Sequence, residues 1–197
     1  MNKQSVILKT FIICLFAIFT AGVLNAEPPK ERTFEKFTCD GNFFTAMIPS
    51  DWEKAEEIIL GRAEKRYGVD LTAPETAEGA FTNISLIYFG PDHLVFETYE
   101  KYIAKNLEMP RKKKGEKTTG PRELIFNGRK AITFEIERYE AIPPFAAAPA
   151  WVLIYQKQIV IPAKEGFFVI ILESPKTAAK TYLDIFDKIG ASFKPNM

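Results

Sequence analysis

The chain contains very little histidine and cysteine. Among its 197 residues, His93 is the one histidine, and the two cysteines are Cys14 and Cys39. A site built from two or more histidines is therefore excluded, and a Ser-His-Asp triad would have a single candidate base. Because Cys14 lies in an apolar leader, the rest of the chain cannot form an intramolecular disulfide. We interpret Cys39 as a buried apolar residue on a strand, with an intermolecular bridge or a redox role as the alternative.

Sequence motifs for common cofactors and nucleophiles are missing as well. The chain contains no G-x-x-x-x-G-K-[ST], no G-x-G-x-x-G and no G-x-S-x-G pattern. Those patterns form a phosphate-binding loop, a dinucleotide-binding turn and a serine nucleophile, respectively. We therefore predict no cofactor and no enzymatic activity. A carboxylate pair for hydrolysis stays open, because acidic residues are plentiful.

The charge of the chain has no strong excess of either sign. It carries 26 basic residues, of which Lys3 and Lys9 lie in the leader, against 25 acidic residues. A dedicated nucleic-acid-binding domain usually has a pronounced basic excess. The composition therefore argues against nucleic acid as a partner.

The first 26 residues have the order of a secretory signal. Lys3 and Lys9 precede and flank an apolar block over residues 11–19, and Leu24-Asn25-Ala26 supplies a small-residue end. This order predicts cleavage and export to the periplasm or the exterior, with no stable membrane anchor afterwards. Retention as an anchor is the alternative, although the apolar run is shorter than the roughly 20 residues that span a bilayer. Lipid attachment at Cys14 is disfavoured, since bulky Ile13 precedes it.

The remaining sequence reads as a flexible leader over residues 27–33 and one α+β domain over residues 34–197. Alternating or continuous apolar runs predict strands, and an Asn127-Gly128 turn predicts a hairpin. The run over residues 167–172 is apolar throughout, so we expect a central strand with both of its faces covered. The predicted strands are 34–38, 43–48, 58–60, 67–71, 81–89, 124–126, 132–136, 151–161 and 167–172, with a loop between 71 and 80.

Two amphipathic helices are predicted. The first begins at an Asp92 cap and runs to about Met109, before Pro110. The second begins with Ser174 as its cap and Pro175 in its first turn, and Gly190 follows its end. Its apolar stripe comprises Ala178, Tyr182, Ile185, Phe186 and Ile189.

Two groups of residues are candidates for binding. Asp92, His93 and Glu97 are close in sequence and form a weak metal-binding signal, for which an ordinary histidine in the first helical turn is the alternative. The basic run of Arg111, Lys112, Lys113 and Lys114 could bind an anion or a partner, or could simply be a hydrated loop.

The stretch from Ala141 to Ala150 is apolar and rich in proline, whereas loops are usually polar. It could present Ile142 and Phe145 to a partner or line a pocket, or it could cover the end of its own sheet. We take Ile142 and Phe145 as the leading partner-binding candidates.

The order of these features resembles the PsbP-like proteins, which include extrinsic proteins of the photosystem II oxygen-evolving complex and bacterial relatives. The resemblance rests on Pro49-Ser50-Asp51-Trp52 after a short strand, on Gly128-Arg129-Lys130-Ala131, on Gly166-Phe167-Phe168-Val169, and on the ending Ala191-Ser192-Phe193. It implies an α-β-α sandwich with a central antiparallel sheet and a mostly non-enzymatic adaptor role. It transfers no metal-binding residue, because the chain lacks the histidines that such sites would need.

Together these observations predict an exported, non-catalytic binding or assembly-support protein with an unknown protein partner. The alternative is an extracytoplasmic small-molecule carrier or hydrolase with a pocket at the end of the sheet.

Overall fold

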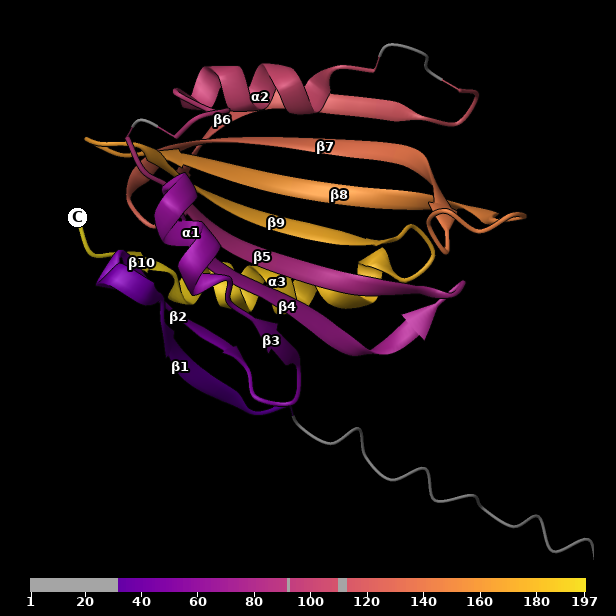
Figure 1. Ribbon diagram of the computed structural model, residues 1–197, viewed down its shortest axis with the longest axis horizontal. Coiled ribbons are helices and arrows are strands. Elements are labelled where there is room, and N and C mark those ends of the chain that lie inside the picture. Colours follow the sequence, from indigo (N-terminus) through magenta and orange to yellow (C-terminus); the bar gives the residue numbers. More distant parts are fainter. Residues whose placement is uncertain (1–31, 92, 110–112) are drawn as a thin grey trace, which may run out of the picture. The chain divides into compact units, whose positions relative to one another are not determined.

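Seven antiparallel strands form the central sheet of this protein. The structure, a computed structural model, describes residues 32–91, 93–109 and 113–197. The predicted signal, most of the predicted leader, Asp92, Arg111 and Lys112 lie outside these residues. In spatial order, the strands are β3 (Glu53–Ala55), β4 (Arg66–Ala77), β5 (Ala80–Phe89), β9 (Phe167–Pro175), β8 (Ala150–Pro162), β7 (Arg129–Ile142) and β6 (Lys117–Phe126) (Figure 1).

Each face of this sheet is covered by a different helix. Alternate residues of β5 and β9 point to opposite faces, as the two-residue repeat of a strand requires. Phe168 and Ile170 pack with α3 (Ala179–Ser192), whereas Phe167 and Val169 pack with α2 (Tyr99–Leu107). The predicted α-β-α sandwich with a central antiparallel sheet is therefore confirmed.

A second, three-stranded sheet packs against α3. It consists of β2 (Phe44–Pro49) between β1 (Phe34–Thr38) and β10 (Lys194–Pro195). A short 3-10 helix, η1 (Asp40–Asn42), makes the turn that the sequence predicts between the first two strands. Phe44 contacts Phe168 and Phe193 edge-on or tilted, and Trp52 contacts Tyr182. Cys39 is buried in this core, and burial raises the pKa of its thiol, which fits the interpretation as an apolar residue. It does not lie on a strand, as predicted, but directly after β1, where it precedes η1.

The central hairpins follow the sequence pattern closely. Asn127 and Gly128 both adopt positive φ, as the predicted turn between β6 and β7 requires. Phe134 and Ile136 are buried on one face of β7, as expected from the alternation. The asparagine has a further role, because its Nδ2 donates hydrogen bonds to the carbonyls of Gly190 and Phe193 at the end of α3.

The start of α2 was predicted too early. The helix begins at Tyr99, and its cap is Thr98, whose hydroxyl accepts from Lys101 N at 3.3 Å. The reason lies in His93, whose Nδ1 accepts from the backbone N–H groups of Val95 and Phe96 at 3.2 and 3.0 Å. This local turn satisfies the N–H groups that a longer helix would have used.

The start and end of α3 also differ from the prediction. Ser174 and Pro175 close β9 instead of opening the helix, because Ser174 pairs with Tyr155 and its hydroxyl lies 2.7 Å from that of Thr82. Gly190 lies within α3, which ends at Ser192. A Cβ at this position would lie 3.1 Å from the ring of Phe126, so the glycine allows close packing of β6 on the helix.

Two shorter elements were also predicted wrongly. Residues 58–60 open the helix α1 (Ile58–Glu64), where Gly61 fits against the carbonyl of Arg66, and do not form a strand. The predicted loop over 71–80 is mostly strand, since β4 continues to Ala77 before a turn at Glu78 and Gly79. None of the helices within the described ranges is long and apolar enough to cross a membrane.

Candidate functional site: a polar pocket and the loop end of the sheet

The face of the sheet that carries α2 changes from apolar to polar along its strands. On β8, this face presents Val160 beneath α2, then Gln158 and Gln156, and then Ile154 and Val152 near the strand start. Gln156 and Gln158 are only 4% and 1% exposed, although their side chains are polar. A polar band therefore crosses the middle of an otherwise apolar face.

Strand register aligns polar residues of the neighbouring strands with these two glutamines. Asn83 of β5 pairs with Glu173 of β9, and Glu173 pairs in turn with Gln156. In the same way, Ser85 of β5 pairs with Asp70 of β4. The band thus draws its side chains from four adjacent strands.

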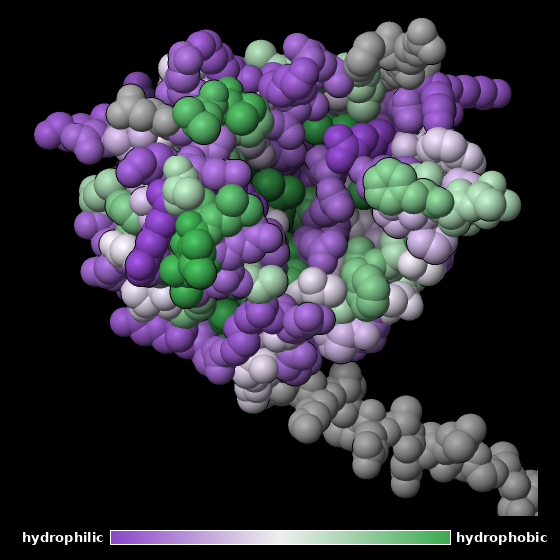
Figure 2. All heavy atoms as spheres, in the orientation of Figure 1, coloured by the Kyte–Doolittle hydropathy of each residue, from purple (hydrophilic) through white to green (hydrophobic). Residues whose placement is uncertain are grey.

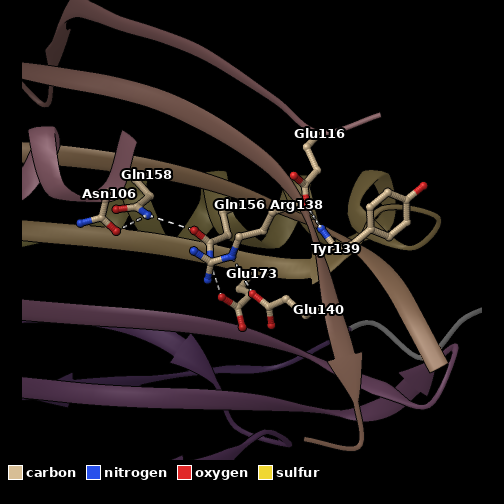
Figure 3. A network of polar contacts seen from close by, with 8 residues as sticks. All are labelled: Asn106, Glu116, Arg138, Tyr139, Glu140, Gln156, Gln158 and Glu173. Carbon is tan, nitrogen blue, oxygen red and sulfur yellow. Dashed lines mark hydrogen bonds and ion pairs between the residues drawn. The ribbon is translucent and has the colours of Figure 1, made fainter. Parts of the chain in front are cut away.

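The band lies next to the last turn of α2. Asn106 of this turn lies within hydrogen-bond distance of Gln158, with Gln158 Nε2 donating to Asn106 Oδ1 at 3.4 Å (Figure 3). Asn106 is itself oriented by a bond from its Nδ2 to the carbonyl of Tyr102, at 2.9 Å. Because α2 ends at Leu107, the helix covers only part of the face, and the polar band begins at its end.

A directional chain of hydrogen bonds runs through the band. Tyr102 donates its hydroxyl to Gln158 Oε1 at 2.7 Å, and Gln158 Nε2 donates to Gln156 Oε1 at 3.2 Å. Gln156 Nε2 then donates to a carboxylate oxygen of Glu173 (Figure 3). Each amide is fixed by its neighbours, so the polar groups are held in one arrangement before any ligand arrives.

The charged groups of the band are mostly paired. Arg138 of β7 donates to Glu140 at 2.7 Å, and Arg66 lies 3.6 Å from Asp70. Burial raises the pKa of Glu173, and the charges of Glu140 and Asp70 raise it further. The hydrogen bond from Gln156 and the charge of Arg138 act in the opposite direction without cancelling this shift.

These residues surround a pocket of about 360 Å³. Figure 2 shows the molecule hollowed over the middle of β5, β9 and β8, on the face turned toward the viewer. One apolar side chain, Ile171, contributes to the lining, and the other lining residues are Asp70, Asn83, Ser85, Asn106, Gln156, Gln158 and Glu173. The arrangement offers both donors and acceptors to a small polar molecule.

The predicted partner-binding loop lies at one end of the same sheet. Phe145 is fully exposed and has a positive φ of 64°, a conformation that is unfavourable for a phenylalanine. Ile142 faces inward instead and packs with Ala80, Val152 and Ile154. The loop is therefore anchored through one of its two predicted residues and displays the other.

The basic loop reaches the same end of the sheet. Lys113 places its ammonium 3.7 Å from the ring centre of Trp151, which is 58% exposed at the start of β8. Lys114 is exposed to solvent. The loop is fixed to β7 by Glu116, whose carboxylate accepts from the backbone N–H of Lys113 at 2.7 Å. It also accepts from the backbone N–H of Tyr139 at 2.9 Å (Figure 3). These backbone hydrogen bonds hold the pKa of Glu116 below its usual value.

Of the three weak metal-binding candidates, His93 and Glu97 lie among the described residues, and each is engaged by other groups, whereas Asp92 lies outside these residues. His93 is buried between aromatic rings, and its Nδ1 already accepts two backbone N–H groups. Burial lowers the pKa of its imidazole. Glu97 forms an ion pair with Lys101 on the surface. Across the residues that the structure describes, no three His, Cys, Asp or Glu side chains are arranged to hold a metal ion.

Sequence reasoning did not identify the polar pocket. One signal was present, because Gln156 and Gln158 occupy alternate positions of the predicted strand 151–161, and Glu173 directly follows the apolar run over residues 167–172. Alternate residues on a strand lie on the same face, so two polar residues at this spacing indicate a polar patch on one face of the sheet. The register that brings Asn83 and Asp70 beside them cannot be read from a single strand.

Comparisons with known proteins identify the fold. No protein-family model matches the sequence, and a search of curated proteins finds no significant match. Among solved structures, cyanobacterial PsbP of Synechocystis sp. PCC 6803 superposes with a TM-score of 0.50 at 12% identity, covering 83% of this chain and 93% of the other. The fold is PsbP-like.

Two further structures resemble this chain at lower TM-scores. PA94, a protein of unknown function from Pseudomonas aeruginosa, has a TM-score of 0.48 at 9% identity, with 83% of this chain and 98% of the other covered. LpqN of Mycobacterium tuberculosis, which is involved in cell envelope biogenesis, has a TM-score of 0.46 at 16% identity, with coverages of 83% and 91%. At 12% identity, the likeness to cyanobacterial PsbP shows the fold alone.

Proposed function

We propose that this chain is an exported, non-catalytic binding protein that docks a protein partner at the loop end of its sheet. The observation that carries the proposal is the full exposure of Phe145 on a loop that Ile142 anchors to the core. Because Ile142 anchors the loop, binding orders little more than the Phe145 side chain itself. The low entropic cost favours the use of this aromatic ring as an anchor.

The surroundings of Phe145 indicate what kind of partner fits. Trp151 adds a second exposed aromatic ring at the same end of the sheet, and Lys113 and Lys114 add positive charge. Aromatic anchors beside basic side chains are typical of protein interfaces. The partner would carry an apolar pocket flanked by acidic residues.

The resemblance of the fold also supports a non-catalytic role. The likeness to cyanobacterial PsbP concerns the fold, and the PsbP-like resemblance implies an adaptor more readily than an enzyme. Export rests on the secretory order of residues 1–26. Fractionation of the native host would test it separately from docking.

The docking surface is tested by crosslinking and pull-down from the extracytoplasmic fraction of the native host. We expect Phe145→Ala to reduce recovery of a defined partner at least tenfold, and Trp151→Ala to reduce it further. Ile59→Ala serves as the control, because Ile59 is an exposed apolar residue, at 89%, but belongs to α1, next to the opposite end of the sheet. Equal recovery with Phe145→Ala and Ile59→Ala would reject this surface.

A further inference from the structure

The polar band occupies a position where apolar side chains would stabilise the fold. Beneath α2, the same face carries Val160, Val169 and Phe167, all of them buried. Burying polar groups costs free energy unless every hydrogen bond is replaced, and a half-satisfied network is worse than an apolar surface. A polar band kept between two apolar segments of one strand face therefore requires a role other than stability.

We propose that this pocket binds a small, uncharged, hydroxyl-rich molecule of about the size of a monosaccharide or disaccharide. Amide and carboxyl side chains line it, and these groups together accept from and donate to ligand hydroxyls. Its volume of about 360 Å³ lies at the small end of the range for small-molecule sites. The polar lining excludes a lipid or another large apolar ligand.

The charges around the pocket favour a neutral ligand. Of the three carboxyl groups that face the band, Asp70 and Glu140 are paired with Arg66 and Arg138. Glu173 is the third; it is partly buried beside the other two acids, and this raises its pKa. Because an arginine pairs with two of the three carboxyl groups, the site favours a neutral ligand over a free cation or anion.

Hydrogen bonds within the protein orient the polar side chains on both sides of the pocket before a ligand binds. On one side, the chain from Tyr102 through Gln158 and Gln156 holds Glu173 in place. On the other side, Thr72 donates to Asn83 Oδ1 at 2.9 Å, which orients the amide. Within the described part of the chain, Asn83 Nδ2 makes no hydrogen bond, so its donors can serve a ligand. Such preorganisation lowers the entropic cost of binding.

Isothermal titration calorimetry of the purified chain tests the proposal. The probes are a panel of neutral mono- and disaccharides and polyols, with spermidine and citrate as cationic and anionic comparisons. We expect saturable binding of at least one neutral probe and none of the charged ones. Asn83→Leu, which replaces the amide with an apolar side chain of similar size, should weaken this binding at least tenfold, while circular dichroism confirms that the variant is folded.

Further variants separate the pocket from the rest of the surface. Glu173→Gln should also weaken saccharide binding, whereas its matched control Glu53→Gln, on the exposed edge strand β3, should not. Phe145→Ala should leave saccharide affinity unchanged, which distinguishes this site from the docking surface. The proposal is overturned if only spermidine or citrate binds, if no probe binds at millimolar concentration, or if both pocket variants bind as the wild type does.

Discussion

At the scale of single residues, Glu173 has the most informative environment. It is a carboxyl group on the central strand β9, and burial together with Glu140 and Asp70 raises its pKa. A carboxyl group whose pKa is higher in the folded state binds more protons when folded than when unfolded. Its contribution to the free energy of unfolding is therefore greatest below the unfolded pKa and decreases as pH rises through the raised value.

This sign leads to a pH-dependent prediction for Glu173→Gln. The substitution removes the ionisation, and the new amide oxygen can still accept from Gln156. The free energy of unfolding of the variant, relative to the wild type, should therefore rise as pH increases above about 4 and through the raised pKa of Glu173. Urea denaturation across that range measures it.

Glu137 provides a control of the opposite sign. Its burial disfavours the charged form, but Lys176 and Lys117, at 2.7 and 3.1 Å, outweigh burial and hold its pKa below the usual value. Stability from this group is present above the unfolded pKa and is lost as pH falls through the lowered value. Relative to the wild type, Glu137→Gln should therefore lose stability as pH rises through that window. Parallel trends for the two variants would contradict the assigned environments.

At the scale of elements, the apolar stripe of α3 was predictable because it repeats every three or four residues. Tyr182, Phe186 and Ile189 are all buried against the sheet, as the spacing indicates. The ends of the helix were not predictable in the same way. Ser174 and Gly190 have the residue types of helix ends, but a strand pairing and a close contact with Phe126 determine their actual positions.

The candidate site was likewise predictable only where it depends on local sequence patterns. The exposed Phe145 and the basic loop could be proposed from sequence, because an apolar loop and a charge cluster are both local patterns. The polar pocket depends on the register of four strands and on where α2 ends. Register is a property of pairing between distant segments, so no local pattern could place Asn83 beside Glu173.

The packing of α3 gives a prediction at this scale. Phe186 is completely buried between the helix and the sheet. Phe186→Ala should lower the free energy of unfolding by about 3–5 kcal/mol, since it removes a large buried side chain and leaves a cavity. Chemical denaturation measures this loss. Phe145→Ala is the matched control and should change stability by less than about 0.5 kcal/mol, because its ring contacts solvent. Equal losses would show that Phe186 does not hold α3 to the sheet.

At the scale of the whole domain, the two ends of the described chain meet in one small sheet. β10 pairs with β2, and Asn196 N donates to the carbonyl of Phe43 at 2.9 Å. Phe193, which is 1% exposed, lies just before β10 and contacts Phe44 and Phe168. It therefore joins the second sheet, the end of α3 and the central sheet in a single core.

Two truncations separate the contribution of the Phe193 ring to the free energy of unfolding from that of β10. Removing residues 194–197 deletes the β10 pairing and the three Asn196 hydrogen bonds, and should lower the free energy of unfolding by about 2–4 kcal/mol, since each net hydrogen bond contributes about 0.5–1.5 kcal/mol. Removing residues 193–197 also deletes Phe193 and should cost about 3–5 kcal/mol more, as other buried aromatic truncations do. Urea denaturation midpoints at constant slope measure both losses. If the two truncations were equally stable, Phe193 would not be what closes the core, and β10 alone would join the ends of the domain.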